Sequence, residues 1–568
     1  MHTPLFRIRL LSFFVVVFAF VLIAKLYHVQ IVNGSEYSDR ADRQYIKPNQ
    51  VLFDRGSIFF ETKDGTTIGA ATVKEGFTLV MHPKQLADAE AAYATLSTIV
   101  PLSKEEFMEK AKKVDDPYEE LLRKVDRKVG IQIGELGIPG IRVYKENWRY
   151  YPGNKMASHT VGLVGYKGDE LGGRYGLERY YEDILGRSSG GLYVNFFAEV
   201  FSNIKNTLFN GRELEGDIVT TIEPSVQNYL ETTLENIHND WSPDEIGGII
   251  IDPRTGEIYA MAALPDFNAN NLKEEKDPRV FSNPLVENVY EMGSIIKPLT
   301  MAAALDTGVV TAASTYKDDG FLVLNNRRIS NYDGKARGVV KMQEILSQSL
   351  NTGVAYLVTK IGKEQFADYM RSFGIGELTG IDQPNEQAGI TENLRSSRDI
   401  ELATAAYGQG IAMSPIATVR ALSTIANGGM LITPHLVKRI DYKVGVSKTI
   451  EPDPGTRVLK KETADEVTRM LVEVVDTALK RGEVKMEDYS VAAKTGTAQI
   501  ADNVNGGYLD DQYLHSFFGY FPSYNPQFLV FLYQVKPKGA DYASETLTYP
   551  FIDIAKFLIN YYEVAPDR

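Results

Sequence analysis

One long apolar run stands near the start of the chain, before apolar and polar positions begin to alternate. It covers residues 10–24 and follows Arg7 and Arg9. Extended as a helix to position 32, it provides about 20 residues, enough to cross a bilayer. The stretch after it lacks a small-x-small cleavage site, which favours a retained signal anchor over a cleaved signal peptide. Since the two arginines favour a cytoplasmic N-terminus, we expect a tail at 1–9 and a membrane span at 10–32, with the rest of the chain outside the cytoplasm.

Between 33 and 211 the pattern is mixed. Short β-like runs such as 77–80 alternate with stretches whose apolar residues recur every three or four positions. That spacing predicts helices at 104–113 and 118–125. Glycines crowd residues 162–191, which is typical of tight turns near a domain edge. We expect a first extracytoplasmic domain over 33–211.

From position 212 the pattern becomes more regular. Two apolar runs, 246–251 and 257–263, are joined by a loop that contains Pro253 and Gly256, and this predicts a β-hairpin. Other runs predict strands at 217–222, 490–493 and 528–534, and helices at 224–237, 298–305, 342–350, 400–407 and 463–479. A sheet with helices clustered around it is the α+β class, which we expect for a second domain over 212–568.

Composition excludes several classes of function. The chain has 568 residues and a formal net charge of -13. An acidic chain is a poor nucleic-acid binder, because phosphate contacts need clustered lysine and arginine. There are no cysteines, which excludes a cysteine nucleophile, cysteine-bound zinc and disulfides. Acidic pairs such as Asp115-Asp116 are typical of solvated surface, and we expect no metal or cofactor.

The candidate chemistry begins with a Ser-x-x-Lys motif, Ser294 to Lys297. Residues i and i+3 of a helix share a face, so the two side chains are expected to lie together. A serine hydroxyl needs a neighbouring base, and a lysine is such a base when burial and nearby cations lower its pKa. Alone the motif is a weak signal, since the spacing recurs at Ser202/Lys205 and Ser314/Lys317.

Two more motifs lie downstream. Ser349-Leu-Asn351 stands at the end of a predicted helix, and Lys494-Thr-Gly-Thr497 follows a predicted strand. Lys-Thr-Gly occurs once in the chain. The three motifs thus fall on a helix start, a helix end and a strand, which together can wall a cleft.

In this order the three motifs resemble the active site of penicillin-binding proteins and serine β-lactamases. Gly408-Gln-Gly410 and other surrounding residues are similar to class B penicillin-binding proteins. The N-terminal region also resembles that class, in the motifs Arg55-Gly-Ser-Ile58, Arg149-Tyr-Tyr-Pro152 and Gly176-Leu-Glu178 of the non-catalytic pedestal. One departure is the stretch 59–65, where the family usually has Asp-Arg-Asn-Gly.

The resemblance implies a role for each catalytic residue. Ser294 would attack a D-Ala-D-Ala stem peptide while Lys297 takes its proton. Ser349 would relay protons between the two lysines and the leaving amine. Asn351 would orient Lys297 or bind the substrate amide. Lys494 would keep Lys297 less protonated and attract the substrate carboxylate.

The remaining site residues follow from the same resemblance. The hydroxyls of Thr495 and Thr497 would bind the substrate carboxylate, and Gly496 would let the substrate lie against its strand. The backbone N–H groups of Ser294 and Thr497 would form an oxyanion hole. Four pedestal residues would be structural: Arg55, Gly56, Arg149 and Glu178.

The implied protein is a peptidoglycan D,D-transpeptidase with the penicillin-binding transpeptidase fold, an antiparallel sheet flanked by helices, on an elongated mixed β-rich pedestal. It would be a single-pass protein of the plasma membrane, inhibited covalently by β-lactams and working with a multi-pass glycosyltransferase. Residues 31–37 favour a septal role over an elongation role.

Three alternatives are less favoured. A β-lactamase needs a device that directs water at the acyl-enzyme, and none is visible in the sequence. A β-lactam sensor needs a cytoplasmic signalling segment, and the expected tail is short. An inactive scaffold would be free to lose Ser294, Lys297 or Lys494, and all three are present.

Overall fold

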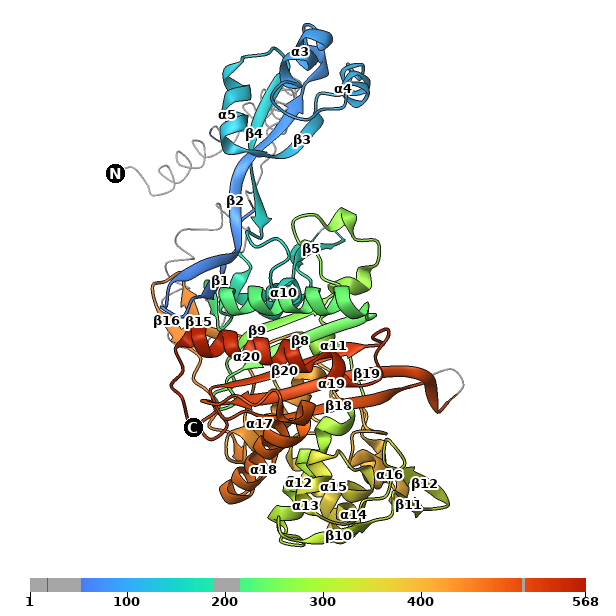
Figure 1. Cartoon of the computed structure of the whole chain (residues 1–568). Coiled ribbons are helices and arrows are strands. Elements are labelled where there is room, and N and C mark those ends of the chain that lie inside the picture. Colours follow the sequence, from blue (N-terminus) through green and yellow to red (C-terminus); the bar gives the residue numbers. More distant parts are fainter. Residues whose placement is uncertain (1–17, 19–52, 169, 188–214, 503–505) are drawn as a thin grey trace, which may run out of the picture. The chain divides into compact units, whose positions relative to one another are not determined.

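The computed structural model describes residues 18, 53–168, 170–187, 215–502 and 506–568 (Figure 1). Apart from residue 18, the predicted tail and membrane span lie outside this part of the chain. Within it, every helix is too short or too polar to span a bilayer. The chain divides into two compact units, the first containing Glu75–Trp148 and the second Arg55–Lys74 together with Arg149–Arg568.

Between Glu75 and Trp148 the first unit has three α-helices and three strands around one apolar core. Its elements are the end of β2 (Thr67–Met81), α3 (Ala89–Leu96), α4 (Lys104–Ala111), β3 (Glu119–Asp126), α5 (Arg127–Glu135) and β4 (Ile141–Tyr150). Leu79, Leu96, Phe107 and Ile133 form the centre of the core. The helix predicted at 104–113 is confirmed as α4.

The helix predicted at 118–125 is wrong, because these residues form strand β3. This strand pairs antiparallel with β2, from Gly76 opposite Asp126 to Met81 opposite Glu119. A short apolar run is ambiguous between helix and strand when judged by spacing alone. Here β2 supplies the backbone hydrogen-bond partners, so these residues form a strand. Val125 of this strand lies in the apolar core.

A five-stranded antiparallel sheet forms the centre of the second unit. Its order is β18 (Ala492–Ala501), β19 (Tyr508–Phe521), β20 (Phe528–Val535), β8 (Glu245–Ile251) and β9 (Ile258–Leu264). The predicted hairpin is confirmed, since β8 pairs with β9 from Ile246 opposite Leu264 to Ile251 opposite Ile258. The strands predicted near 490 and 528 are confirmed as β18 and β20.

Helices cover both faces of this sheet (Figure 1). On one face, α10 (Pro224–Trp241) and α20 (Thr548–Tyr562) pack with Ile250 of β8. On the other, α12 (Lys297–Asp306), α17 (Pro415–Ala426) and α18 (Lys461–Glu473) pack with Ile249. Successive residues of a strand point to opposite faces of the sheet. Because both faces are buried, residues on both sides are apolar, which explains the continuous apolar runs in the sequence. This agrees with the predicted α+β class.

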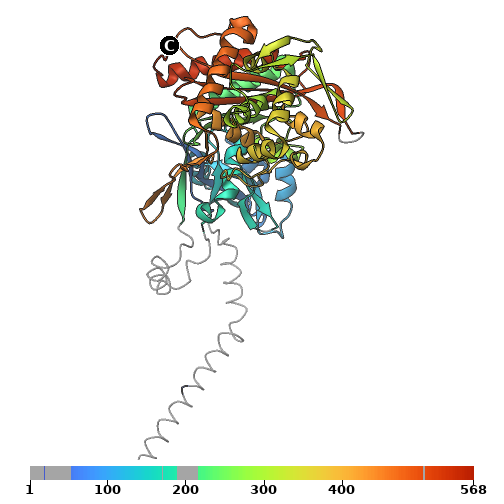
Figure 2. The same cartoon turned by 90° about the horizontal axis from the view of Figure 1, so that it is seen from below.

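The last residues of the chain return from α20 to the segment after α18 (C in Figures 1 and 2). Arg568 forms a two-pronged ion pair with Asp476, with contacts of 2.6 and 3.0 Å. The Asp567 carboxylate accepts the Ser490 N–H at 2.6 Å. The C-terminus is thereby tied to the entry into β18.

A second sheet in this unit joins segments that are far apart in the sequence. β1 (Ile58–Glu61) pairs in parallel with β7 (Gly216–Thr220) and antiparallel with the start of β2. β7 pairs with β15 (Val437–Tyr442), and β15 with β16 (Ser447–Thr449). Residues 55–74 therefore share a sheet with parts of 212–568.

Shorter elements complete the second unit. Between residues 151 and 287 they are α6 (Ser158–Val161), β5 (Val164–Lys167), β6 (Glu170–Gly173), α7 (Gly176–Tyr180), α8 (Glu182–Leu185) and α11 (Pro284–Glu287). After α12 come β10 (Thr315–Asp318), β11 (Phe321–Leu324), β12 (Arg327–Ser330), β13 (Gly338–Lys341), α13 (Met342–Ser347), α14 (Asn351–Ile361), α15 (Lys363–Ser372), α16 (Asp399–Ala405), β14 (Met430–Leu431), β17 (Thr456–Arg457) and α19 (Ala543–Thr546).

Candidate active site

Ser294 and Lys297 lie at the entry of a buried central helix. Ser294 is in a short 3-10 turn, Gly293–Ile296, and Lys297 is the first residue of α12. Side chains three residues apart in a 3-10 turn are nearly eclipsed, so the two share one face. Gly293 has a φ of +65°, and a Cβ there would lie 2.9 Å from the Thr497 carbonyl oxygen. Only glycine combines this backbone conformation with so close an approach to β18.

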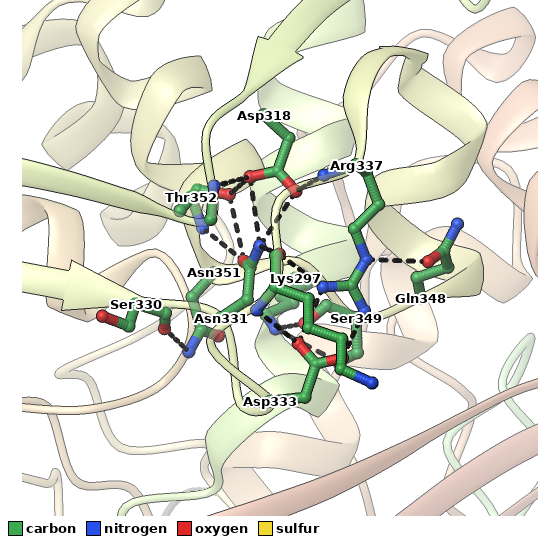
Figure 3. Close-up of polar contacts among 12 residues, drawn as sticks. Lys297, Asp318, Ser330, Asn331, Asp333, Arg337, Gln348, Ser349, Asn351 and Thr352 are labelled. Carbon is green, nitrogen blue, oxygen red and sulfur yellow. Dashed lines mark hydrogen bonds and ion pairs between the residues drawn. The ribbon is translucent and has the colours of Figure 1, made fainter.

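The hydroxyl of Ser349 lies between the amines of Lys297, labelled in Figure 3, and Lys494. It is 3.1 Å from Lys297 Nζ and 3.1 Å from Lys494 Nζ. Lys297 Nζ also donates to the Ser349 carbonyl oxygen at 2.6 Å. The three predicted residues, distant in sequence, therefore form one continuous hydrogen-bonded chain.

Both lysines are removed from water. Lys297 is 0% exposed and Lys494 is 3% exposed. Burial lowers the pKa of Lys494 to about 8. Burial, reinforced by the positive charge of Lys494, lowers the pKa of Lys297 well below its usual range. Low solvation disfavours an ammonium and so provides a basic amine near neutral pH.

Ser349 lies in a turn between two helices, which corrects the helix predicted at 342–350. α13 ends at Ser347, and α14 begins at Asn351. Ser349 has a φ of +55°, a left-handed conformation that a helix cannot contain. The turn aims the serine hydroxyl and carbonyl together at Lys297. Asn351 donates from Nδ2 to the Ser330 carbonyl oxygen at 3.0 Å, and the described hydrogen bonds of Lys297 go to Ser349 rather than to this amide.

The third motif lies within β18 rather than after a strand. A Cβ at Gly496 would be 2.4 Å from Ser516 Oγ and 2.7 Å from the Met292 carbonyl oxygen. The glycine thus allows the strand to pack closely on the segment that precedes Ser294. Thr497 Oγ1 accepts the N–H of Ala543 at 3.1 Å, which links the strand to α19.

The structure distinguishes the copies of Ser-x-x-Lys that it describes. Ser314 accepts the Thr311 N–H through its hydroxyl at 2.9 Å, and the exposed Lys317 pairs with Asp319 at 2.8 Å. That copy is an ordinary surface turn. The copy at Ser202 lies outside the described residues.

The pedestal motif residues converge on one buried carboxylate. Glu178, 0% exposed, accepts from Arg55 Nε at 2.6 Å and from Arg149 Nε at 2.5 Å. Arg149 Nη1 donates to the Gly56 carbonyl oxygen at 2.8 Å. Burial works to lower the pKa of Arg55, but the neighbouring carboxylates outweigh it and raise that pKa. A second carboxylate, Glu182, also pairs with Arg55. No feature of the sequence indicates this role.

A buried polar cluster that the sequence motifs do not indicate lies behind the Ser349 turn (Figure 3). Asp318, Asn331 and Thr352 are 1%, 3% and 5% exposed and hydrogen-bonded to one another. Their only sequence signal is that Thr352 directly follows Asn351. Within the described residues, no three histidine or acidic side chains are grouped to hold a metal ion.

Comparison with known proteins extends these observations. Residues 246–553 match the profile of the penicillin binding protein transpeptidase domain, and residues 54–220 match that of the penicillin-binding protein dimerisation domain. The chain is 29% identical over 565 residues to stage V sporulation protein D of Bacillus subtilis, covering 96% of this chain and 84% of the relative. It is 26% identical over 558 residues to the probable peptidoglycan D,D-transpeptidase PenA of Neisseria meningitidis, covering 96% and 91%.

A solved structure shares the fold. Penicillin binding protein 2X from Streptococcus thermophilus superposes with a TM-score of 0.72 at 19% identity, over 90% of this chain and 80% of that one. The transpeptidase fold expected from the sequence is thereby confirmed.

Proposed function

Because this chain belongs to the class B penicillin-binding proteins and is a serine-type peptidoglycan D,D-transpeptidase, we propose that Ser294 is its nucleophile and that Lys297, Ser349 and Lys494 move the protons. The observation that carries this assignment is the Ser349 hydroxyl, 3.1 Å from each lysine amine. A hydroxyl both accepts and donates, so it can pass a proton between two amines.

Acylation replaces the peptide C–N bond of the substrate by an ester bond to Ser294. Ser294 Oγ attacks the carbonyl carbon of the penultimate D-Ala, and its proton passes to neutral Lys297. The C–N bond breaks, and the leaving D-Ala amine receives a proton through Ser349. The backbone N–H groups of Ser294 and Thr497 stabilise the oxyanion. An acceptor amine from a second stem peptide then displaces Ser294 and restores its proton.

The substrate is bound by the charge of Lys494 and by residues of strand β18. Lys494 attracts the terminal carboxylate of the donor peptide, and the hydroxyls of Thr495 and Thr497 bind it. Asn351, at the start of α14, binds the substrate amide. A β-lactam presents a similar carboxylate and a reactive carbonyl, so it acylates Ser294; its ring C–N bond breaks, but the amine stays attached to the opened ring and does not leave.

The pH dependence of acylation follows from the two lysines. The reaction needs Lys297 neutral and Lys494 charged, so its rate falls as acid protonates Lys297 and falls again as base removes the proton of Lys494. With the pKa of Lys494 at about 8, we expect the alkaline limb near that pH. Lys494→Arg keeps its charge to much higher pH, so this variant should lose the alkaline limb, although its maximum rate falls. An unchanged limb would assign it to another group.

The assignment of the nucleophile is tested by labelling the full-length chain in detergent with a fluorescent penicillin and mapping the adduct by mass spectrometry. We expect a long-lived adduct on the peptide that contains Ser294. Ser314→Ala, in the surface copy of the motif, should label like the wild type. An adduct lost within seconds would indicate a β-lactamase, and a folded chain without label would indicate a scaffold.

We also propose the surroundings in which the enzyme works. The span at 10–32 anchors it in the plasma membrane, residues 33–211 form the non-catalytic domain, and residues 212–568 form the catalytic one. A multi-pass glycosyltransferase supplies the glycan strands at the division septum. Imaging a fluorescent fusion in the source bacterium tests the last point, because label along the side wall instead of midcell would favour the elongation role.

A further inference from the structure

Asp318 is a buried carboxylate that no proposed catalytic step uses. It lies at the end of β10 and accepts hydrogen bonds from the backbone N–H groups of Gly320 at 3.0 Å and Arg337 at 3.1 Å. The Asn331 amide donates to both of its oxygens, at 3.1 and 3.0 Å. Within the described chain no cation forms an ion pair with it: its hydrogen bonds come from neutral donors, and the Arg337 guanidinium acts on it only through longer-range attraction. A carboxylate satisfied in this way holds each donor firmly in place.

A further donor to Asp318 comes from the start of α14, next to the catalytic turn. The Thr352 hydroxyl lies 2.8 Å from Asp318 Oδ1 and 3.0 Å from Asn331 Oδ1. The Thr352 N–H also donates to Asn331 Oδ1, at 3.3 Å. Thr352 is three residues after Ser349, so the start of α14 is fixed to the segment that contains β10 and β12.

The other flank of the turn is held by the same segment (Figure 3). Arg337 Nε donates to Gln348 Oε1 at 3.0 Å. The Arg337 guanidinium is itself fixed by two contacts with Asp333, at 2.7 and 2.8 Å. Ser349 therefore stands between two residues, Gln348 and Thr352, that are each bound to residues 318–337.

The turn needs such support. A non-glycine residue with a left-handed backbone is strained and persists only when its surroundings over-determine it. Ser349 has this backbone, and both its carbonyl and its hydroxyl contact Lys297. A small shift of the turn would therefore misplace the proton relay and the base together.

We propose that Asp318, Asn331 and Thr352 form a positioning cluster that sets the acylation rate by holding the Ser349 hydroxyl between Lys297 and Lys494. None of the three touches the reacting atoms. The proposal rests on the proposed function, because it assumes that Ser349 relays the proton. It assigns control of the reaction to residues outside the three sequence motifs.

Thr352 allows a matched test. Thr352→Val keeps the shape and removes the hydroxyl, whereas Thr352→Ser keeps the hydroxyl. We expect the maximal acylation rate by a fluorescent penicillin to fall about 10- to 100-fold in the valine variant, the range in which small misplacements of catalytic groups act. The serine variant should restore most of the rate. Non-covalent binding before acylation and the melting temperature should change little in either.

The possible outcomes distinguish a failure of the positioning role from a failure of the proposed function. If the wild type labels and the valine variant acylates at the same rate, the positioning role is overturned. It is overturned as well if serine fails to restore the rate, since packing alone would then explain the loss. If the wild type itself does not label, the proposed function fails instead.

A second pair of variants keeps the proposal testable if the valine variant does not fold. Asp318→Asn places an amide N–H₂ against the donors of this cluster and should also slow acylation. Its matched control is Asp319→Asn, because Asp319 is exposed and pairs only with the surface residue Lys317 in the described chain. Equal rates for both would contradict the proposal.

Discussion

Replacing Lys297 by methionine is expected to lower the acylation rate about 100- to 10,000-fold, the range that a general base contributes, while the protein becomes no less stable. Methionine fills a similar volume in the buried space at the start of α12. It cannot accept the proton of Ser294. Ser349 and Lys494 remain in place, but the relay between them no longer reaches a base beside the nucleophile.

The stability side of this prediction follows from proton linkage. Burial and Lys494 lower the pKa of Lys297 in the folded state, whereas in the unfolded chain it is near that of free lysine. Because this pKa is lower in the folded state, the folded chain binds fewer protons at Lys297 than the unfolded chain, which opposes folding and does so more strongly as the pH falls. Methionine has no proton to lose.

The measurement pairs penicillin labelling with urea unfolding of the same preparation. Lys317→Met, at the exposed lysine of the surface motif, is the matched control and should change neither result. An active methionine variant would show that Lys297 is not the base. Loss of both activity and stability would show that the lysine is needed for the fold.

Replacing Glu178 by glutamine is expected to lower the free energy of unfolding by about 3–5 kcal/mol, the usual effect of removing one partner of a buried ion pair. The carboxylate is 0% exposed and neutralises two arginines, Arg55 and Arg149, which are 5% and 8% exposed. Glutamine keeps the size and one acceptor oxygen but no charge. Arg149 then loses its counter-charge, and Arg55 keeps only its pair with the part-exposed Glu182.

Glu182→Gln is the control for this prediction. Glu182 also pairs with Arg55, at 2.7 Å, but its side chain is 41% exposed. An exposed pair contributes about 1 kcal/mol or less, so urea unfolding should show a small change for this variant and a large one for Glu178→Gln. Similar losses in both would mean that water reaches the cluster.

The candidate site is easier to recognise in the sequence than its surroundings. Ser294, Lys297 and Lys494 belong to three short motifs whose order and chemistry can be read without knowing the fold, and the structure brings Lys297 and Lys494 together at Ser349. The turn at Ser349 is not predicted, because the helical spacing of apolar residues continues through 342–350. A left-handed backbone at one residue does not change that spacing. The spacing predicts a helix where strand β3 forms, because the partner that makes it a strand, β2, lies about 45 positions earlier in the sequence.

The cluster around Asp318 illustrates what spacing cannot reveal. Its members are 13 to 34 residues apart, lie on a strand, a loop and a helix, and meet only after the segment 318–352 has folded back on itself. Single aspartate, asparagine and threonine residues are ordinary turn formers when they are read in a sequence. Only their shared burial distinguishes them.

The second compact unit is interrupted in the sequence, since it contains Arg55–Lys74 and resumes at Arg149. A single genetic crossover at the 211/212 boundary would combine β1 of one parent with β7 and β15 of another, and a sheet would then have to be rebuilt from mismatched halves. A double crossover that exchanges 75–148 would carry a whole apolar core with it. Recombination among related genes should therefore exchange this module more readily than a single crossover allows, constrained by β2 and β4, which run across its boundaries, while residues 55–74 are inherited together with the catalytic part.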